Sequence, residues 1–311
     1  MPAKKLPTAT LGRTGLKITR LGFGAMELRD APRGRPVSDD QAKAILNAVL
    51  DSGISFIDTS NDYGRSEEFI GKLISGRRSQ YYLATKCGCI PGGGPHIWTK
   101  ENMFRGLNES LSRLKVDYVD LMQLHGPTVE DAKRGDVVSV LQEMKRQGKV
   151  RWIGCSTTLP ELPTYLQWGV FDEFQIPYSA LQREHEEWIT KSAKAGIGTV
   201  IRGGVAKGEP GVSGMGITYQ RGGVAVKATD VWKPFTDAKL DELREEGEGR
   251  TSFMLRFTLS HPSVNTIIVG TLNPAHLEEN VRAAQRGPLA AKIYAEAKRR
   301  LDGVGMKPAA A

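Results

Sequence analysis

The feature that most constrains the fold is an alternation of short apolar segments with helical ones, repeated eight times along the chain. The apolar segments are bounded by glycine or polar residues, which is typical of buried β-strands. They occupy residues 20–26, 55–58, 81–86, 118–125, 150–155, 171–176, 198–202 and 264–269. The helices expected after them occupy residues 39–52, 66–75, 100–114, 136–147, 159–168, 183–195, 236–246 with 250–260, and 274–285.

Strands that alternate with helices run parallel and are joined by crossovers. Two architectures satisfy this pattern, an open doubly wound sheet and a closed (β/α)8 barrel. Eight units within about 260 residues favour the barrel, which usually needs about 250. We therefore predict an α/β protein, a (β/α)8 TIM barrel with an N-terminal β-hairpin at residues 8–18 and an extra C-terminal helix at about residues 289–302.

No break in composition marks a second domain. A single barrel domain is therefore expected over residues 1–311, with residues 303–311 as a frayed tail. The segment 203–234 is rich in glycine and has no periodic apolar pattern, so we expect it to be a lid or a substrate loop.

Composition argues against several classes of protein. The net charge is +8, but the basic residues are scattered and do not interleave with aromatic residues, which argues against a nucleic-acid surface. No window approaches about 20 apolar residues, so we expect no membrane span. The three cysteines, Cys87, Cys89 and Cys155, form no disulfide framework and indicate a reducing, cytoplasmic location. Their spacing predicts no metal site, and nothing in the sequence indicates the oligomeric state.

Polar residues close three of the predicted strands. Asp58, Lys86 and His125 each end an apolar segment, and Tyr63 follows Asp58 by five residues. In a parallel barrel such ends meet at one rim, so we expect these four side chains to lie together. Considered separately, Asp58 and Lys86 could form a buried ion pair, His125 could be a core histidine, and Tyr63 could be a surface tyrosine. Their shared position at strand ends favours a site.

These residue types suit proton transfer at an oxygen atom. A phenol has an unperturbed pKa of about 10, and an ammonium group at about 4 Å would lower it by roughly three units. We therefore expect Lys86 to lower the pKa of Tyr63, and Asp58 to hold Lys86 charged. His125 would orient a carbonyl oxygen and could relay a proton. The set contains no activated nucleophile, so a nicotinamide is expected to carry the electrons.

Seven segments together resemble one known family. They are LGRTGLKITRLGFGAM, FIDTSNDYG, LATKC, LKVDYVDLMQLHGP, GKVRWIGCS, FQIPYS and VNTIIVGTLNPAHLEEN. The chain is similar to the aldo-keto reductase superfamily, in particular to its shorter members with a compact C-terminus. The resemblance implies a catalytic tetrad of Asp58, Tyr63, Lys86 and His125, and an extended nicotinamide cofactor across the C-terminal mouth of the barrel.

The resemblance also implies where the cofactor lies. The nicotinamide amide is assigned to Ser156 and Gln175, and the adenosine end to residues 270–280, which also begin a helix. The implied cofactor residues are Gly24, Ala25, Asp58, Ser156, Thr157, Gln175, Arg202, Gly203, Gly270, Thr271, Asn273, His276, Glu279 and Asn280.

Two departures from the family pattern bear on the cofactor. Thr157 stands where the family often has asparagine, which removes or replaces one hydrogen bond to the carboxamide. Gly270 and His276 stand where a lysine and an arginine often hold the 2′-phosphate. The resemblance still favours NADP(H), with NAD(H) as the alternative.

The implied activity is that of an NAD(P)H-dependent oxidoreductase that interconverts aldehydes or ketones and alcohols. Two alternatives stay open: an NAD-linked sugar or alcohol dehydrogenase of the same fold, and a slow-turnover, cofactor-sensing interaction subunit. The expected partner is a small carbonyl or alcohol substrate. Met26 and Trp98 are candidate walls of its pocket, with the loops 88–99, 126–135 and 203–234.

Overall fold

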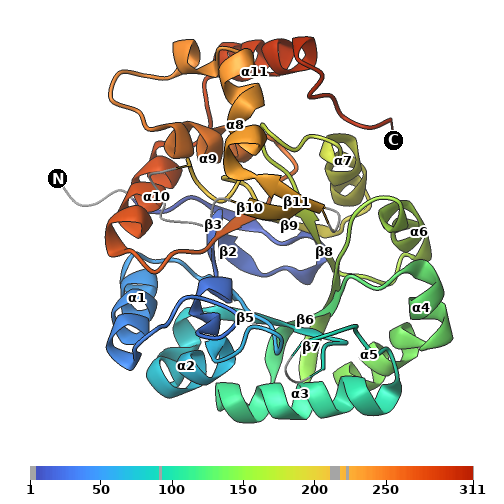
Figure 1. The fold of residues 1–311 in the computed structure, drawn as a ribbon. Helices are drawn as coiled ribbons and strands as arrows, with labels where there is room; N and C mark the ends of the chain where they lie inside the picture. Colours follow the sequence, from blue (N-terminus) through green and yellow to red (C-terminus); the bar gives the residue numbers. More distant parts are fainter. Residues whose placement is uncertain (1–4, 91–92, 211–217, 222–223, 311) are drawn as a thin grey trace.

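The computed structural model describes residues 5–90, 93–210, 218–221 and 224–310. Its centre is a closed barrel of parallel strands in the order β12-β3-β4-β5-β6-β7-β8-β9, ringed by helices (Figure 1). The strands are β3 (Leu21–Gly24), β4 (Phe56–Asp58), β5 (Tyr82–Cys87), β6 (Val119–His125), β7 (Val150–Ser156), β8 (Glu173–Pro177), β9 (Gly198–Arg202) and β12 (Thr266–Val269). The predicted barrel and its eight strands are confirmed.

The helices follow the predicted alternation. They are α1 (Asp39–Asp51), α2 (Ser66–Leu73), α3 (Lys100–Leu114), α4 (Val129–Arg134), α5 (Val137–Arg146), α6 (Glu161–Trp168), α7 (Glu186–Lys194), α8 (Ala228–Asp237), α9 (Arg250–Leu259), α10 (Pro274–Arg286) and α11 (Ala291–Gly303). Short 3-10 helices are η1 (Gly12–Thr14), η2 (Ala25–Arg29), η3 (Ser75–Gln80) and η4 (Leu240–Leu243). None of the helices in these described parts of the chain has the length and apolar character needed to cross a bilayer.

Local chemistry explains where α1 lies. The Ser38 hydroxyl caps its N-terminus by accepting a hydrogen bond from the backbone N–H of Gln41. Apolar residues at helical spacing, among them Ile45 and Val49, are fully buried against the barrel. Gly53 then adopts a φ of 84°, which ends the helical run and turns the chain into β4.

The predicted N-terminal hairpin is confirmed, and it covers the end of the barrel at which the parallel strands begin. Its strands β1 (Thr8–Thr10) and β2 (Lys17–Thr19) pair antiparallel. Leu11 and Ile18 pack with the inward side chains of the barrel strands. Gly12 has a φ of 45°, and a Cβ there would lie 2.2 Å from the backbone nitrogen of Gly198. Only glycine allows the hairpin to approach the barrel this closely.

The segment 203–234 contains more structure than we predicted. In its described part, β10 (Thr218–Arg221) and β11 (Val224–Lys227) form an antiparallel hairpin, and α8 follows at once. Pro234, expected at the end of a loop, lies inside α8. Residues 211–217 and 222–223 of this segment lie outside the described residues.

The predicted helix 236–246 is wrong. Asp237 ends α8, and Lys239 has a φ of 49°, so the chain turns and continues only as the short η4. The loop expected at 126–135 also contains α4, whose N-terminus is capped by the Thr128 hydroxyl.

The chain after α11 is held at two points. The backbone carbonyl of Met306 accepts a 2.9 Å hydrogen bond from Arg183 Nη1. The backbone N–H of Ala309 donates to the carbonyl of Glu184 at 3.2 Å. Residues 306 and 309, which we expected to fray, are therefore attached to the body of the protein.

Candidate active site

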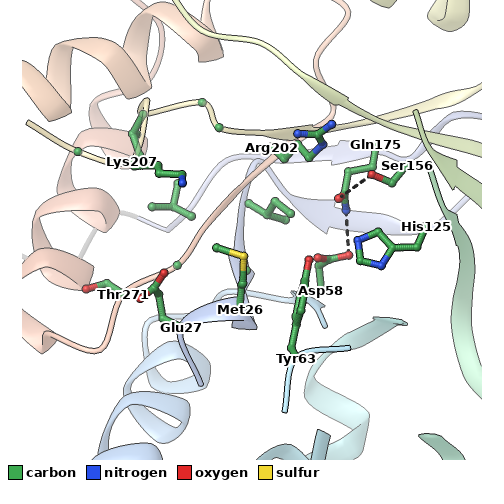
Figure 2. A pocket seen from close by; sticks show the side chains of 18 of the residues that line it. Met26, Glu27, Asp58, Tyr63, His125, Ser156, Gln175, Arg202, Lys207 and Thr271 are labelled. Carbon is green, nitrogen blue, oxygen red and sulfur yellow. Dashed lines mark hydrogen bonds between the residues drawn. The ribbon is translucent and has the colours of Figure 1, made fainter. Parts of the chain in front are cut away.

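A cavity of about 640 Å³ opens at the C-terminal ends of the barrel strands. Residues at the ends of β3, β4, β6, β7, β8, β9 and β12 line it. Asp58, Tyr63 and His125 are among them, as expected from their positions in the sequence. Figure 2 shows these three side chains gathered on one side of the cavity. In a parallel barrel, this is the rim at which functional residues collect.

Lys86 and Asp58 form a buried ion pair beneath the cavity. Lys86 Nζ donates to Asp58 Oδ2 at 2.7 Å and to the backbone carbonyl of Thr59 at 2.8 Å. Asp58 Oδ1 accepts hydrogen bonds from the side-chain amides of Gln123 at 2.8 Å and Gln175 at 2.9 Å. Both charged groups are thus paired and hydrogen-bonded, which is the condition for keeping charge inside a protein.

The ammonium group of Lys86 also acts on Tyr63. Lys86 Nζ lies 5.0 Å from the centre of the Tyr63 ring, close enough for its positive charge to act on the pKa of the phenol. Burial alone would lower the pKa of Lys86, but Asp58 and Tyr63 outweigh it, so that pKa is raised. Lys86 is therefore charged at neutral pH.

The pKa of Tyr63 shifts in the direction opposite to our expectation. Burial of the phenol raises this pKa, and the charge of Lys86 opposes the rise only in part. The ammonium group is evident from the sequence, whereas the loss of water around the hydroxyl arises only in the folded site. Tyr63 is therefore a neutral phenol at neutral pH, a proton donor rather than a phenolate.

His125 is also neutral at neutral pH. Its ring lies edge-on to that of Tyr63, with 6.1 Å between the ring centroids. Burial lowers its pKa well below the usual value, and the nearby charge of Lys86 adds to this effect. A relay through a protonated imidazole, one of the roles we expected, does not fit this shift. A neutral imidazole can still donate one N–H to a substrate oxygen.

The expected nicotinamide residues lie together next to Asp58 and His125. Ser156 Oγ donates to Gln175 Oε1 at 3.4 Å, and the Gln175 amide continues to Asp58 (Figure 2). The Ser156 oxygen can still accept a hydrogen bond and Gln175 Oε1 has a second lone pair, so a carboxamide N–H finds acceptors here. The hydrogen-bond acceptors at this point therefore fit a nicotinamide carboxamide.

The far end of the cavity fits the rest of a dinucleotide. Thr271 lines it, together with three side chains from the first turns of α10, His276, Glu279 and Asn280. The first backbone N–H groups of a helix favour a phosphate. At Gly270 a Cβ would lie 2.4 Å from the backbone oxygen of Gly24, so a larger residue would force β12 and β3 apart at the rim.

Five other expected cofactor residues also line the cavity, whereas two expected residues do not. Gly24, Thr157, Arg202, Gly203 and Gly270 are part of its wall. Ala25 is fully buried in η2 and is absent from the described lining. Asn273 is absent as well, and its side chain caps α10 by accepting from the backbone N–H of Ala275.

The two candidate substrate residues differ. Met26 lines the cavity. Trp98 is only 8 % exposed and does not belong to the described lining. Its indole packs over Gly88, where a Cβ would come within 2.2 Å of the ring, and meets His96 edge-on. The structure therefore places Trp98 in the packing beside the site.

Sequence reasoning missed several polar residues of the cavity, including Glu27, Arg35, Lys207 and Thr251. Lys207 has a φ of 62° in the turn after β9, inside the segment we expected to border the pocket. Nothing in the spacing separates it from the other lysines of the chain. Arg35 pairs with Glu27 at 3.5 Å, a contact that only the fold creates.

Comparisons with known proteins agree with this geometry. The profile described as Aldo/keto reductase family matches residues 20–301. An uncharacterised oxidoreductase of Bacillus subtilis is 30% identical over 286 residues, covering 88% of this chain and 90% of its own. L-galactose dehydrogenase of Arabidopsis thaliana is 27% identical over 304 residues, 90% of this chain and 88% of its own. The holo form of an aldo-keto reductase from Bacillus halodurans superposes with a TM-score of 0.80 at 28% identity, covering 95% of this chain and 96% of its own.

Proposed function

This chain belongs to the aldo/keto reductase family, and we propose that it is an NADP(H)-dependent oxidoreductase that interconverts aldehydes or ketones and alcohols. The observation that carries the proposal is the Tyr63 phenol, which lines the cavity beside the buried ammonium group of Lys86. The Ser156 and Gln175 acceptors next to it suit the cofactor that such chemistry requires.

The proposed mechanism assigns a separate task to each residue. A nicotinamide bound in the cavity supplies the hydride. Tyr63 donates its phenolic proton to the carbonyl oxygen as negative charge develops there, and His125 donates a hydrogen bond to the same oxygen. Lys86 stabilises the phenolate that remains, and Asp58 holds Lys86 in place. Alcohol oxidation uses the same groups in reverse.

The pKa shifts predict how the rate depends on pH. Because the pKa of Tyr63 is raised and that of His125 is lowered, neither group titrates near neutrality. We expect kcat/KM for reduction to be flat between about pH 6 and 8 and to fall only when alkaline pH ionises Tyr63. Initial rates across a buffer series at constant ionic strength check this. A decline centred near pH 6.5, the ordinary pKa of histidine, would contradict the neutral state assigned to His125.

The preference for NADP(H) is a proposal about charge at the far end of the cavity. Arg35, Lys207 and His276 line the cavity and can offset the additional negative charge of a 2′-phosphate. We expect NADPH to bind more tightly than NADH in a fluorescence titration. Equal dissociation constants would remove the preference.

His276 allows a sharper test of the same proposal. A guanidinium group binds phosphate through two parallel hydrogen bonds, so His276→Arg should tighten NADPH binding by about tenfold and leave NADH binding unchanged. Ala275→Arg adds a similar charge one residue away, at an exposed position outside the described lining. An equal gain in both variants would show a general charge effect.

The similarity to L-galactose dehydrogenase favours one second candidate, a sugar dehydrogenase of the same fold. A screen of aldehydes, ketones and sugars, followed by cofactor absorbance with NADP(H) and NAD(H) in both directions, separates the two. Faster reduction of simple aldehydes with NADPH supports the first proposal. Oxidation of sugars with NAD⁺ as the only activity would replace it by the second.

A further inference from the structure

Beside the proposed proton donor lies a cluster of metal-ligating side chains that the mechanism does not use as a group. Asp62, Cys89, His96 and His125 each offer one ligand atom, and these atoms all lie within 4.8 Å of one another. Cys89 Sγ is 3.1 Å from His125 Nδ1, and the rings of His96 and His125 stack at 4.9 Å. We propose that these four side chains form a binding site for a single Zn²⁺ ion.

The donor set matches the coordination chemistry of zinc. One thiolate, two imidazoles and one carboxylate are ligands that Zn²⁺ takes in tetrahedral sites. With Zn–S near 2.3 Å and Zn–N near 2.0–2.1 Å, the ligand atoms of a tetrahedron lie roughly 3.3–3.6 Å apart. The sulfur and Nδ1 are already close to this spacing. Pairs at the 4.8 Å limit must contract by roughly 1.2–1.5 Å to reach the tetrahedral spacing, which side chains at loops and strand ends allow.

The charges of the cluster also suit a divalent cation. Burial raises the pKa of the Cys89 thiol to about 12, so zinc binding must release the thiol proton to solvent. The thiolate formed in this way and the Asp62 carboxylate then carry two negative charges, which neutralise Zn²⁺. Asp62 now pairs with Arg33, whose Nη1 lies 2.6 Å from Asp62 Oδ1. The Arg33 side chain is 41 % exposed, so it can return to water when the metal takes its partner. The Asp62 side chain is only 15 % exposed and accepts hydrogen bonds from both Arg33 amino groups, so zinc binding must outweigh this bidentate pair.

The positions of the ligands explain why no sequence motif indicates the site. Asp62 follows β4, Cys89 and His96 lie between β5 and α3, and His125 ends β6. Three neighbouring strand ends therefore supply the ligands, and no short spacing motif contains them. A sulfur-containing set of this kind excludes Mg²⁺ and Ca²⁺, which require oxygen ligands.

The binding test uses the full chain after removal of metal with a chelator. Equilibrium dialysis should find one Zn²⁺ per chain, and a tenfold excess of Mg²⁺ should not displace it. Co²⁺ at the same site should produce a thiolate-to-cobalt charge-transfer band. Cys89→Ala should abolish the band and weaken Zn²⁺ binding by about 100-fold or more.

Two variants control for the fold and for other thiols. His96→Ala removes a partly exposed ligand and should weaken Zn²⁺ binding without lowering the unfolding temperature. Cys87→Ala removes a thiol two residues away that contacts the Gln123 carbonyl instead, and should keep both the stoichiometry and the charge-transfer band. Loss of binding in Cys87→Ala, undiminished binding in Cys89→Ala, or no stoichiometric binding by the wild type would each overturn the site.

One consequence rests on the proposed function. Coordination through Nδ1 draws the His125 ring toward the metal, and a displacement of about 1 Å can slow a reaction by about 100-fold. We therefore expect Zn²⁺ to inhibit carbonyl reduction without changing cofactor affinity, and His96→Ala to require more Zn²⁺ for the same inhibition. Stoichiometric binding without inhibition would keep the metal site and contradict the role of His125. If the same Zn²⁺ concentration inhibits His96→Ala and the wild type equally, the inhibitory ion binds at another site.

Discussion

Tyr63→Phe should reduce kcat/KM for carbonyl reduction by about 10²–10⁴-fold, the usual contribution of a positioned general acid. The substitution removes one hydroxyl group and keeps the ring that packs edge-on against His125. The dissociation constant of NADPH should stay within about twofold, because the proposed cofactor contacts are made by other residues. Steady-state kinetics and a fluorescence titration measure the two quantities.

Tyr82→Phe is the matched control. Tyr82 is a half-buried tyrosine at the first position of β5, whereas Lys86 and Cys87 lie at its far end. The Tyr82→Phe variant should lose no more than a small fraction of the wild-type activity. If both variants are equally slow, the loss reports a disturbed barrel and the assignment of Tyr63 fails.

Lys86→Met should cost both activity and stability. Removing the ammonium group leaves the Asp58 carboxylate buried with two amide donors and no counter-charge. Breaking a buried pair in this way typically costs about 3–5 kcal/mol. The loss of the positive charge also raises the pKa of Tyr63 further, so the alkaline limb of the reduction profile should move to higher pH while the maximal rate falls. Urea unfolding and pH–rate profiles measure the two effects.

A double variant separates structure from chemistry at this pair. Asp58→Asn combined with Lys86→Met removes both charges and should recover much of the lost stability, but no activity. Lys72→Met removes an exposed lysine that pairs with Asp39. It should leave the activity unchanged and alter the free energy of unfolding by no more than about 0.5 kcal/mol. Recovery of activity in the double variant would show that Lys86 serves only the fold.

The sequence predicted the barrel because its signals are local and repeated. Each strand is an apolar run bounded by breakers, and a residue such as His125 at the end of such a run must reach the rim. The same reasoning failed at Pro234, since a proline inside a helix reads as a break although α8 accommodates it. The position of Trp98 depends on its packing over Gly88, which no periodicity describes.

The electrostatics of the site could be predicted only in part. The sequence places Lys86 near Tyr63, but the sign of the Tyr63 pKa shift depends on how far burial removes water, and that is a property of the folded site. The 3.1 Å contact between Cys89 and His125 likewise depends on how the loop after β5 turns toward the end of β6. Lys207 lines the cavity because of the turn after β9, and the sequence does not reveal the geometry of that turn.

The most direct test of the account isolates the chemical step. Enzyme in excess over bound NADPH is mixed rapidly with an aldehyde that the substrate screen has identified, and the single-turnover loss of NADPH absorbance is recorded for the wild type and Tyr63→Phe at pH 7. We expect the wild type to oxidise its bound cofactor at least 100-fold faster than the variant, with equal amounts of NADPH bound at the start. Equal single-turnover rates would contradict the assignment of Tyr63 as the proton donor.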